Sequence, residues 1–151
     1  MSFLLDTNAV SEWMKPRPDS GLIGWLEEVD EDRVFLSVVT ITELRYGIER
    51  LAAGKRRKQL EDWLEQELPL RFEDRVLAID HAVADACGRL VALREAMGRP
   101  MEAMDAFIAA TVEVHDLTLV TRNARDFEGT VRSVLNPWIG QSVGRRPKAG
   151  F

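Results

Sequence analysis

The sequence predicts one α/β domain built on a mostly parallel sheet, because short apolar runs alternate with amphipathic segments of helical length along its 151 residues. The first run, Phe3-Leu4-Leu5, is too short for a helix, and the run before Thr121 combines Thr with Val, as strands do. Helices that alternate with strands in this way cover both faces of a parallel sheet. The predicted strands are residues 3–5, 34–36, 76–79, 117–120 and 131–135.

The segments between these strands carry apolar residues at helical spacing, together with helix end signals. Pro16 and Pro69 are expected to stop the first and fourth helices, and Gly98 the fifth. Ser37 or Thr40 is expected to cap the third helix, which stops near Gly54. The first, fourth, fifth and sixth helices are predicted at residues 8–15, 55–68, 81–97 and 103–115. The second is capped by Asp19 or Ser20 and carries apolar residues from Leu22 to Val29.

Composition is that of an ordinary globular protein, with 46% apolar residues and a net charge of −5. No apolar run is long enough to span a bilayer, and the N-terminus lacks signal-peptide features, so we expect a cytoplasmic protein without membrane contact. The single Cys87 excludes an internal disulfide and is expected to be a core residue. We assign residues 1–140 to the folded domain and 141–151 to a flexible basic tail.

Carboxylates follow the predicted strands at places where buried charge is not expected by default. Asp6 comes directly after the first strand, and Glu43 lies in the first turn of the helix after the second. Asp105 begins the helix that leads into the fourth strand, and Asp126 lies in the loop after that strand. Functional groups of open parallel sheets gather beyond the carboxyl ends of the strands. The sequence therefore predicts that these four side chains converge at one edge.

A divalent cation is the expected partner of these carboxylates. Asp105 points along the apolar helix face of Ile108, Ala109 and Val112, where an unpaired charge is costly. Oxygen ligands without His or Cys select Mg²⁺ or Mn²⁺ over zinc. Such an ion activates water and stabilises the leaving oxygen of a phosphodiester, which implies metal-assisted hydrolysis of a phosphate ester.

Each carboxylate also has an ordinary structural interpretation. Glu43 has capping-box spacing from Thr40, and Asp6 can cap the helix that begins near Asn8. Asp105 is favoured by the helix dipole, and Asp126 by a turn. Four such residues at one sheet edge are harder to explain by these roles.

The ordered set of motifs resembles the PIN-domain ribonucleases, and among them the VapC-type toxins of bacterial toxin–antitoxin pairs. The resemblance covers nearly the whole chain and rests on residues 5–12, 42–47, 105–111, 119–127 and 136–138. It implies a three-layer α/β/α fold with a five-stranded, mostly parallel sheet. It also implies a Mg²⁺- or Mn²⁺-dependent endoribonuclease, a homodimer, and a cognate antitoxin that blocks the pocket.

The resemblance assigns the acidic positions to Asp6, Glu43 and Asp105. The fourth position aligns with Asn123, an amide, while Asp126 stands three residues further on, and either residue is a candidate to complete the metal site. The neighbouring residues expected to support the ligands are the hydroxyls of Thr7 and Thr121, with Asn8 orienting Asp6.

Two alternatives remain open from the sequence. An aspartyl-phosphate-type phosphatase also has an Asp after its first strand, but it usually needs a second Asp two residues on, where this chain has Asn8. A non-catalytic module that binds a basic peptide in its acidic pocket is the other.

Overall fold

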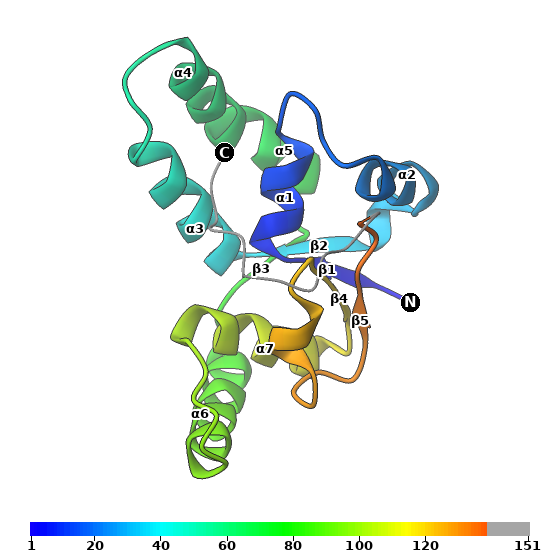
Figure 1. Cartoon of the computed structure of the whole chain (residues 1–151), viewed down its shortest axis with the longest axis vertical. Coiled ribbons are helices and arrows are strands. Elements are labelled where there is room, and N and C mark those ends of the chain that lie inside the picture. The colour runs from blue at the N-terminus through cyan, green and yellow to red at the C-terminus, as the bar shows by residue number, and fades with distance from the viewer. Residues whose placement is uncertain (139–151) are drawn as a thin grey trace.

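The computed structural model describes residues 1–138, which form one sheet with helices on both faces (Figure 1). All five strands run parallel in the order β3-β2-β1-β4-β5, so β1 lies at the centre. This confirms the predicted fold class. The basic tail predicted for 141–151 lies outside the described residues. The strands are β1 (Phe3–Leu5), β2 (Val34–Ser37), β3 (Val76–Leu77), β4 (Thr118–Val120) and β5 (Val134–Leu135).

Neighbouring residues of the central strands supply two separate cores, because successive side chains of a strand point to opposite faces of the sheet. Leu5 and Val120 pack with one core, and Leu4 and Leu119 with the other. All four side chains are fully buried. The two-sided burial explains why these strands are continuous apolar runs without alternation.

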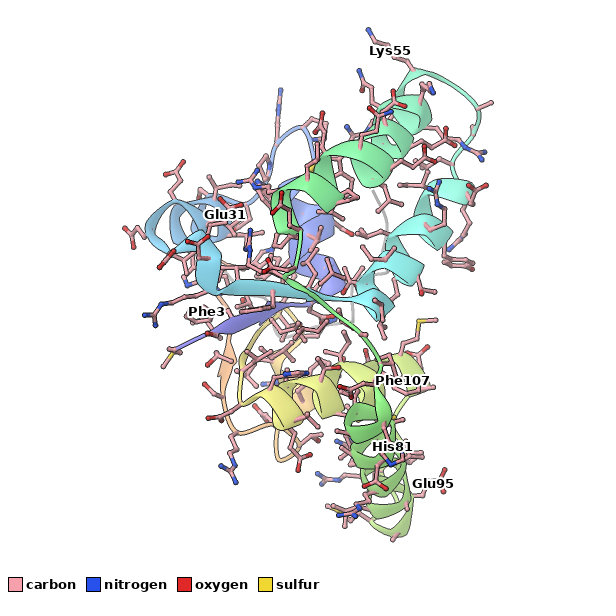
Figure 2. The ribbon with its side chains drawn as sticks, turned by 180° about the vertical axis from the view of Figure 1, so that it is seen from behind. Phe3, Glu31, Lys55, His81, Glu95 and Phe107 are labelled. Carbon is pink, nitrogen blue, oxygen red and sulfur yellow. The ribbon has the colours of Figure 1, made fainter. Side chains whose placement is uncertain are left out.

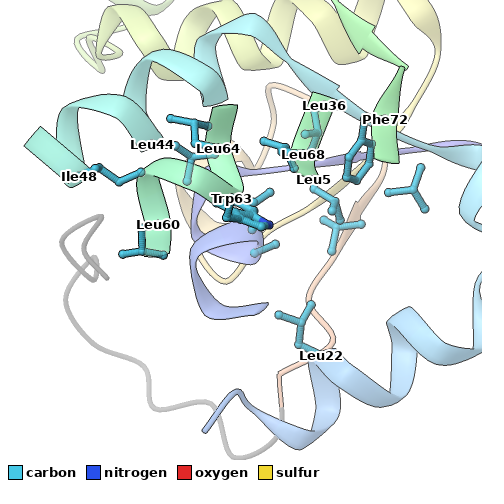
Figure 3. Close-up of a cluster of buried hydrophobic side chains, with 14 of the residues drawn as sticks. Leu5, Leu22, Leu36, Leu44, Ile48, Leu60, Trp63, Leu64, Leu68 and Phe72 are labelled. Carbon is cyan, nitrogen blue, oxygen red and sulfur yellow. The ribbon is translucent and has the colours of Figure 1, made fainter. Parts of the chain in front are cut away.

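The helices divide between these two faces. The first core packs side chains from α1 (Thr7–Trp13), α2 (Ser20–Glu28), α3 (Val38–Glu49), α4 (Lys55–Asp62) and α5 (Leu68–Phe72), as Figure 3 shows. The second core packs side chains from α6 (His81–Ala96), α7 (Ala103–His115) and the 3₁₀ turn η3 (Ala124–Phe127). Another 3₁₀ turn, η1 (Glu31–Arg33), precedes β2. Cys87 belongs to this second core, where burial raises the pKa of its thiol, as expected for a structural cysteine. No helix within 1–138 has the length and apolar character that crossing a membrane requires.

The prediction that Pro69 ends the fourth helix is wrong. A π-helical turn, η2 (Trp63–Glu67), follows α4, and the helical path continues through Pro69 to Phe72. In this turn the Leu68 N–H donates to the carbonyl of Trp63, five residues back. Proline ends a regular α-helix because its ring clashes with the carbonyl four residues earlier and because it lacks an N–H. The wider turn just before Pro69 changes that spacing, so the helix passes the proline.

Candidate functional site

Asp6 is built into the junction between the central strand and the first helix. Its N–H donates to the carbonyl of Val120 at 2.9 Å, which extends the pairing of β1 with β4 by one residue. The side chain then caps α1, since Oδ1 accepts the Thr7 N–H at 2.8 Å. Only 6% of the residue's surface is exposed. The carboxylate is therefore fixed by backbone structure at the carboxyl edge of the sheet.

The second oxygen of Asp6 is held by the end of the neighbouring strand. Oδ2 accepts the Thr121 hydroxyl at 2.8 Å and the Asn8 amide at 3.2 Å. Thr121 is fully buried, and its Oγ1 also accepts from Asn8 Nδ2 and from the Asn123 N–H, each at 3.1 Å. A hydroxyl has one proton and two lone pairs. With both lone pairs occupied, the Thr121 proton has to point at Asp6.

Asn8 ties this network to the loop that follows β4. Its Nδ2 donates to Asp6 and Thr121, and its Oδ1 accepts the Arg122 N–H at 3.1 Å. The Asp6 carboxylate therefore accepts a hydrogen bond from each of the three residues named from the sequence as its supports: the N–H of Thr7, the amide of Asn8 and the hydroxyl of Thr121. The contacts of Asn8 with Thr121 and Arg122 cross from the first helix to the segment that follows β4.

Thr7 connects Asp6 to a second carboxylate, that of Glu43. While its N–H donates to Asp6, its hydroxyl oxygen lies 2.7 Å from Glu43 Oε1. Glu43 is half-buried on α3, which follows β2. One residue therefore sets the relative positions of the two carboxylates.

The alternative interpretation of Glu43, as a capping-box residue, is wrong. Ser37 is the N-cap of α3, because its hydroxyl accepts the Val39 N–H at 3.0 Å. With Ser37 as the N-cap, the third helical position, where a capping box needs Glu or Gln, is Thr40, so Glu43 in the second turn has no capping-box role. The sequence offers Thr40 as the alternative cap to Ser37, and Thr40 does not cap the helix. It is instead fully buried, with its hydroxyl oxygen 3.2 Å from that of Thr7.

Asp105 lies in the first turn of α7 and is 7% exposed. The predicted apolar face is confirmed, since Ile108, Ala109 and Val112 are all buried. Because α7 leads into β4, its N-terminus lies toward the edge at which β4 ends. The helix dipole favours a carboxylate in this first turn.

The two candidates for the fourth position differ in their surroundings. Asn123 is half-buried, and its N–H donates to the Thr121 hydroxyl that holds Asp6. Asp126 lies one 3₁₀ turn further, within η3, and is exposed. Asn123 thus adjoins the Asp6 network directly, whereas Asp126 is linked to it through its own N–H, which donates to the Asn123 carbonyl at 3.0 Å.

The donor set fits a hard divalent cation, since the nominated side chains offer only carboxylate, amide and hydroxyl oxygens. Within residues 1–138, no three acidic, His or Cys side chains form a ready-made metal cluster. Magnesium commonly binds through one or two carboxylates, with water and substrate phosphate supplying its other ligands. These residues therefore suit a water-rich magnesium site better than a closed cage of protein ligands.

The basic run at the start of α4 lies apart from these residues. Arg57 pairs with Glu49 at 2.8 Å and with Glu61 at 2.9 Å, and Lys58 pairs with Asp62 at 3.2 Å. Figure 2 shows Lys55 at the outer end of α4, on the side of the sheet opposite α6. Arg57 and Lys58 therefore form ion pairs with acidic residues of α3 and α4, which agrees with a solvated helix face.

The class of the protein is an α/β protein with an all-parallel sheet, in which the buried carboxylate of Asp6, linked through Thr7 to that of Glu43, stands at the carboxyl edge where functional groups gather. The family model for the PIN domain matches residues 3–131. Toxin FitB of Neisseria gonorrhoeae is 36% identical over 135 residues, which cover 89% of this chain and 97% of FitB. The VapC ribonuclease Y4jK of Sinorhizobium fredii is 33% identical, with coverages of 89% and 96%. The chain belongs to the PIN-domain family, and the resemblance seen in the motifs is confirmed.

Solved structures agree with this family. The crystal structure of FitAcB from Neisseria gonorrhoeae aligns with a TM-score of 0.84 at 36% identity, covering 91% of this chain and 99% of the other. VapBC-5 from Mycobacterium tuberculosis, a member of the VapBC family of toxin–antitoxin systems, aligns with a TM-score of 0.63 at 27% identity. That alignment covers 88% of this chain and 97% of the other. The relatives thus match along nearly their whole length.

Proposed function

We propose that this protein is a Mg²⁺- or Mn²⁺-dependent endoribonuclease that serves as the toxin of a toxin–antitoxin pair. The relatives support the ribonuclease and toxin classes, since their names include a toxin and a VapC ribonuclease. The observation that carries the proposal is the pair Asp6 and Glu43, two carboxylates joined through Thr7 at the carboxyl edge of the sheet. A family member with such a pair has the oxygen ligands that metal-assisted phosphodiester hydrolysis needs.

In this proposal the carboxylates of Asp6, Glu43 and Asp105 bind the metal, and the side-chain oxygen of Asn123 is the fourth protein ligand. When bound, the ion polarises a phosphoryl oxygen and lowers the pKa of a coordinated water. The protein's own contribution is positioning. Thr121, Asn8 and the Thr7 N–H orient Asp6, and the Thr7 hydroxyl orients Glu43.

The proposed substrate is RNA, and metal removal tests this. The chain carries a net charge of −5 and its site is acidic, so an RNA phosphate approaches favourably only when a cation offsets that charge. We expect chelation by EDTA to stop cleavage of a fluorescent RNA and to weaken its binding in a filter assay. Excess Mg²⁺ or Mn²⁺ should restore both. Equal RNA affinity in EDTA and in Mg²⁺ would contradict RNA binding through a bound metal ion. Tight binding of basic peptides, without any binding of Mn²⁺, would favour a non-catalytic binding module.

The fourth position gives a second test, through Asn123→Ala and Asp126→Ala. If Asn123 supplies a ligand oxygen, its loss should lower the cleavage rate by at least about 10-fold, because removing a residue that only supports metal ligands already costs about 10–100-fold. Asp126 is exposed within η3, and its replacement should leave the rate within about threefold, because surface substitutions have small effects. The measurement is the steady-state rate at which each variant cleaves the same RNA. A larger loss in Asp126→Ala than in Asn123→Ala would assign the fourth metal-ligand position to Asp126.

We propose two partners besides RNA. A cognate antitoxin is expected because similar solved structures include a member of the VapBC toxin–antitoxin systems. A homodimer in the cytoplasm is expected from the same family resemblance. The phosphatase alternative receives no support, since the position of its second Asp is taken by Asn8, whose amide holds Asp6.

A further inference from the structure

Thr40 is a buried hydroxyl that neither the core nor a helix cap accounts for. It is fully buried in the first turn of α3, one helical turn before Glu43. Its oxygen lies 3.2 Å from Thr7 Oγ1, which in turn lies 2.7 Å from Glu43 Oε1. A buried hydroxyl without a partner is costly, and here the partner belongs to the residue that joins the two carboxylates.

Proton counting sets the direction of these two hydrogen bonds. An ionised Glu43 can only accept, and Thr7 has a single hydroxyl proton, so that proton goes to Glu43. The oxygen of Thr7 must then accept from Thr40. The result is a one-way chain in which Thr40 donates to Thr7 and Thr7 donates to Glu43. Accepting a bond makes the Thr7 hydroxyl a stronger donor.

We propose that Thr40 is a positioning residue, whose hydroxyl fixes Thr7 and thereby orients the Glu43 carboxylate for the metal. The inference rests on the proposed metal-dependent nuclease. It assigns Thr40 no contact with RNA or with the reacting atoms. Its action runs entirely through Thr7, so removing Thr7's hydroxyl should make Thr40's hydroxyl irrelevant to the site.

The test compares Thr40→Val, which has nearly the same shape but no hydroxyl, with Thr40→Ser, which keeps it. We expect Thr40→Val to weaken Mn²⁺ affinity, measured by calorimetry without RNA, and to lower kcat, each by about 10-fold or more. Thr40→Ser should stay within about threefold of wild type. KM for RNA should change less than kcat, because Thr40 does not touch the substrate.

A matched control separates positioning from packing. Thr111 is also fully buried, but its hydroxyl donates to the carbonyl of Phe107 in its own helix at 2.7 Å. Thr111→Val removes a buried hydroxyl in the same way and should leave Mn²⁺ affinity unchanged. In a Thr7→Val background, adding Thr40→Val should have no further effect, since the two residues act as one unit.

Several outcomes overturn the inference. Wild-type Mn²⁺ affinity in Thr40→Val, equal losses in Thr40→Ser and Thr40→Val, or additive losses in the Thr7→Val background would each assign Thr40 to packing alone. If Thr40→Val does not fold, Thr40→Ala against Thr40→Ser gives the same comparison. Absence of Mn²⁺ binding and cleavage in the wild type would overturn the proposed function as well, whereas a fully active Thr40→Val overturns only this inference.

Discussion

Asp6→Asn removes metal-dependent RNA cleavage, with an expected loss of more than about 100-fold. Changes to residues that only support metal ligands already cost about 10–100-fold, so loss of the proposed ligand should exceed that range. Cleavage is measured under single-turnover conditions with Mg²⁺ in excess.

The same substitution also affects folding, because both oxygens of Asp6 accept hydrogen bonds. Oδ1 accepts the Thr7 N–H, and Oδ2 accepts from Asn8 and Thr121. Asparagine has one acceptor oxygen, so its NH₂ must face a donor in either orientation. We expect the free energy of unfolding to fall by about 1–3 kcal/mol, the cost of a buried polar group left unsatisfied.

Asp80→Asn is the matched control for Asp6→Asn. Asp80 caps α6, where its Oδ1 accepts the Val83 N–H at 2.9 Å, and asparagine caps helices equally well. The control should retain activity and stability. An Asp6→Asn protein that cleaves RNA at the wild-type rate would defeat the assignment of Asp6 to the metal site.

Asp105→Asn is expected to remove cleavage to a similar extent and to abolish stabilisation by Mn²⁺. An ion that binds only the folded state raises the free energy of unfolding by about 2.7 kcal/mol at 100 times its dissociation constant. The wild type should therefore melt at a higher temperature as Mn²⁺ is added, and Asp105→Asn should not. Thermal unfolding followed by circular dichroism with and without Mn²⁺ measures this difference.

The control for Asp105→Asn is Glu113→Gln, which neutralises an exposed carboxylate on the same helix. It should keep both the Mn²⁺ response and the cleavage rate. If Asp105→Asn is stabilised by Mn²⁺ as strongly as the wild type, Asp105 is a helix-start carboxylate and not a ligand.

Much of the fold was predictable because its signals are local. The central strands are apolar runs buried on both sides, and the burial of Asp105 follows from the helical spacing of Ile108, Ala109 and Val112. The helix continues through Pro69 because of the π turn at Trp63–Glu67, which the local proline signal does not reveal; Leu60 before the turn and Leu68 after it are both buried in the first core. Strands β3 and β5 are also shorter than the predicted 76–79 and 131–135, since the length of a strand depends on its pairing with neighbouring strands.

The residues of the site could likewise be predicted from local signals, whereas the contacts between them could not. Asp6 and Glu43 stood out as carboxylates near strand ends, but their link through Thr7 depends on how α1 and α3 pack, which no local pattern specifies. The sequence leaves the cap of this helix open between Ser37 and Thr40, because both are local cap signals three residues apart, and Ser37 is the cap. Contacts between distant segments decided both outcomes.

Anomalous diffraction from a crystal soaked in Mn²⁺ tests the central proposal most directly. We expect one strong peak in contact with carboxylate oxygens of both Asp6 and Asp105, and its loss in Asp6→Asn. A crystal at saturating Mn²⁺ with no peak beside Asp6, and with Asp105 too distant to share an ion, would contradict a metal-dependent site at this edge of the sheet.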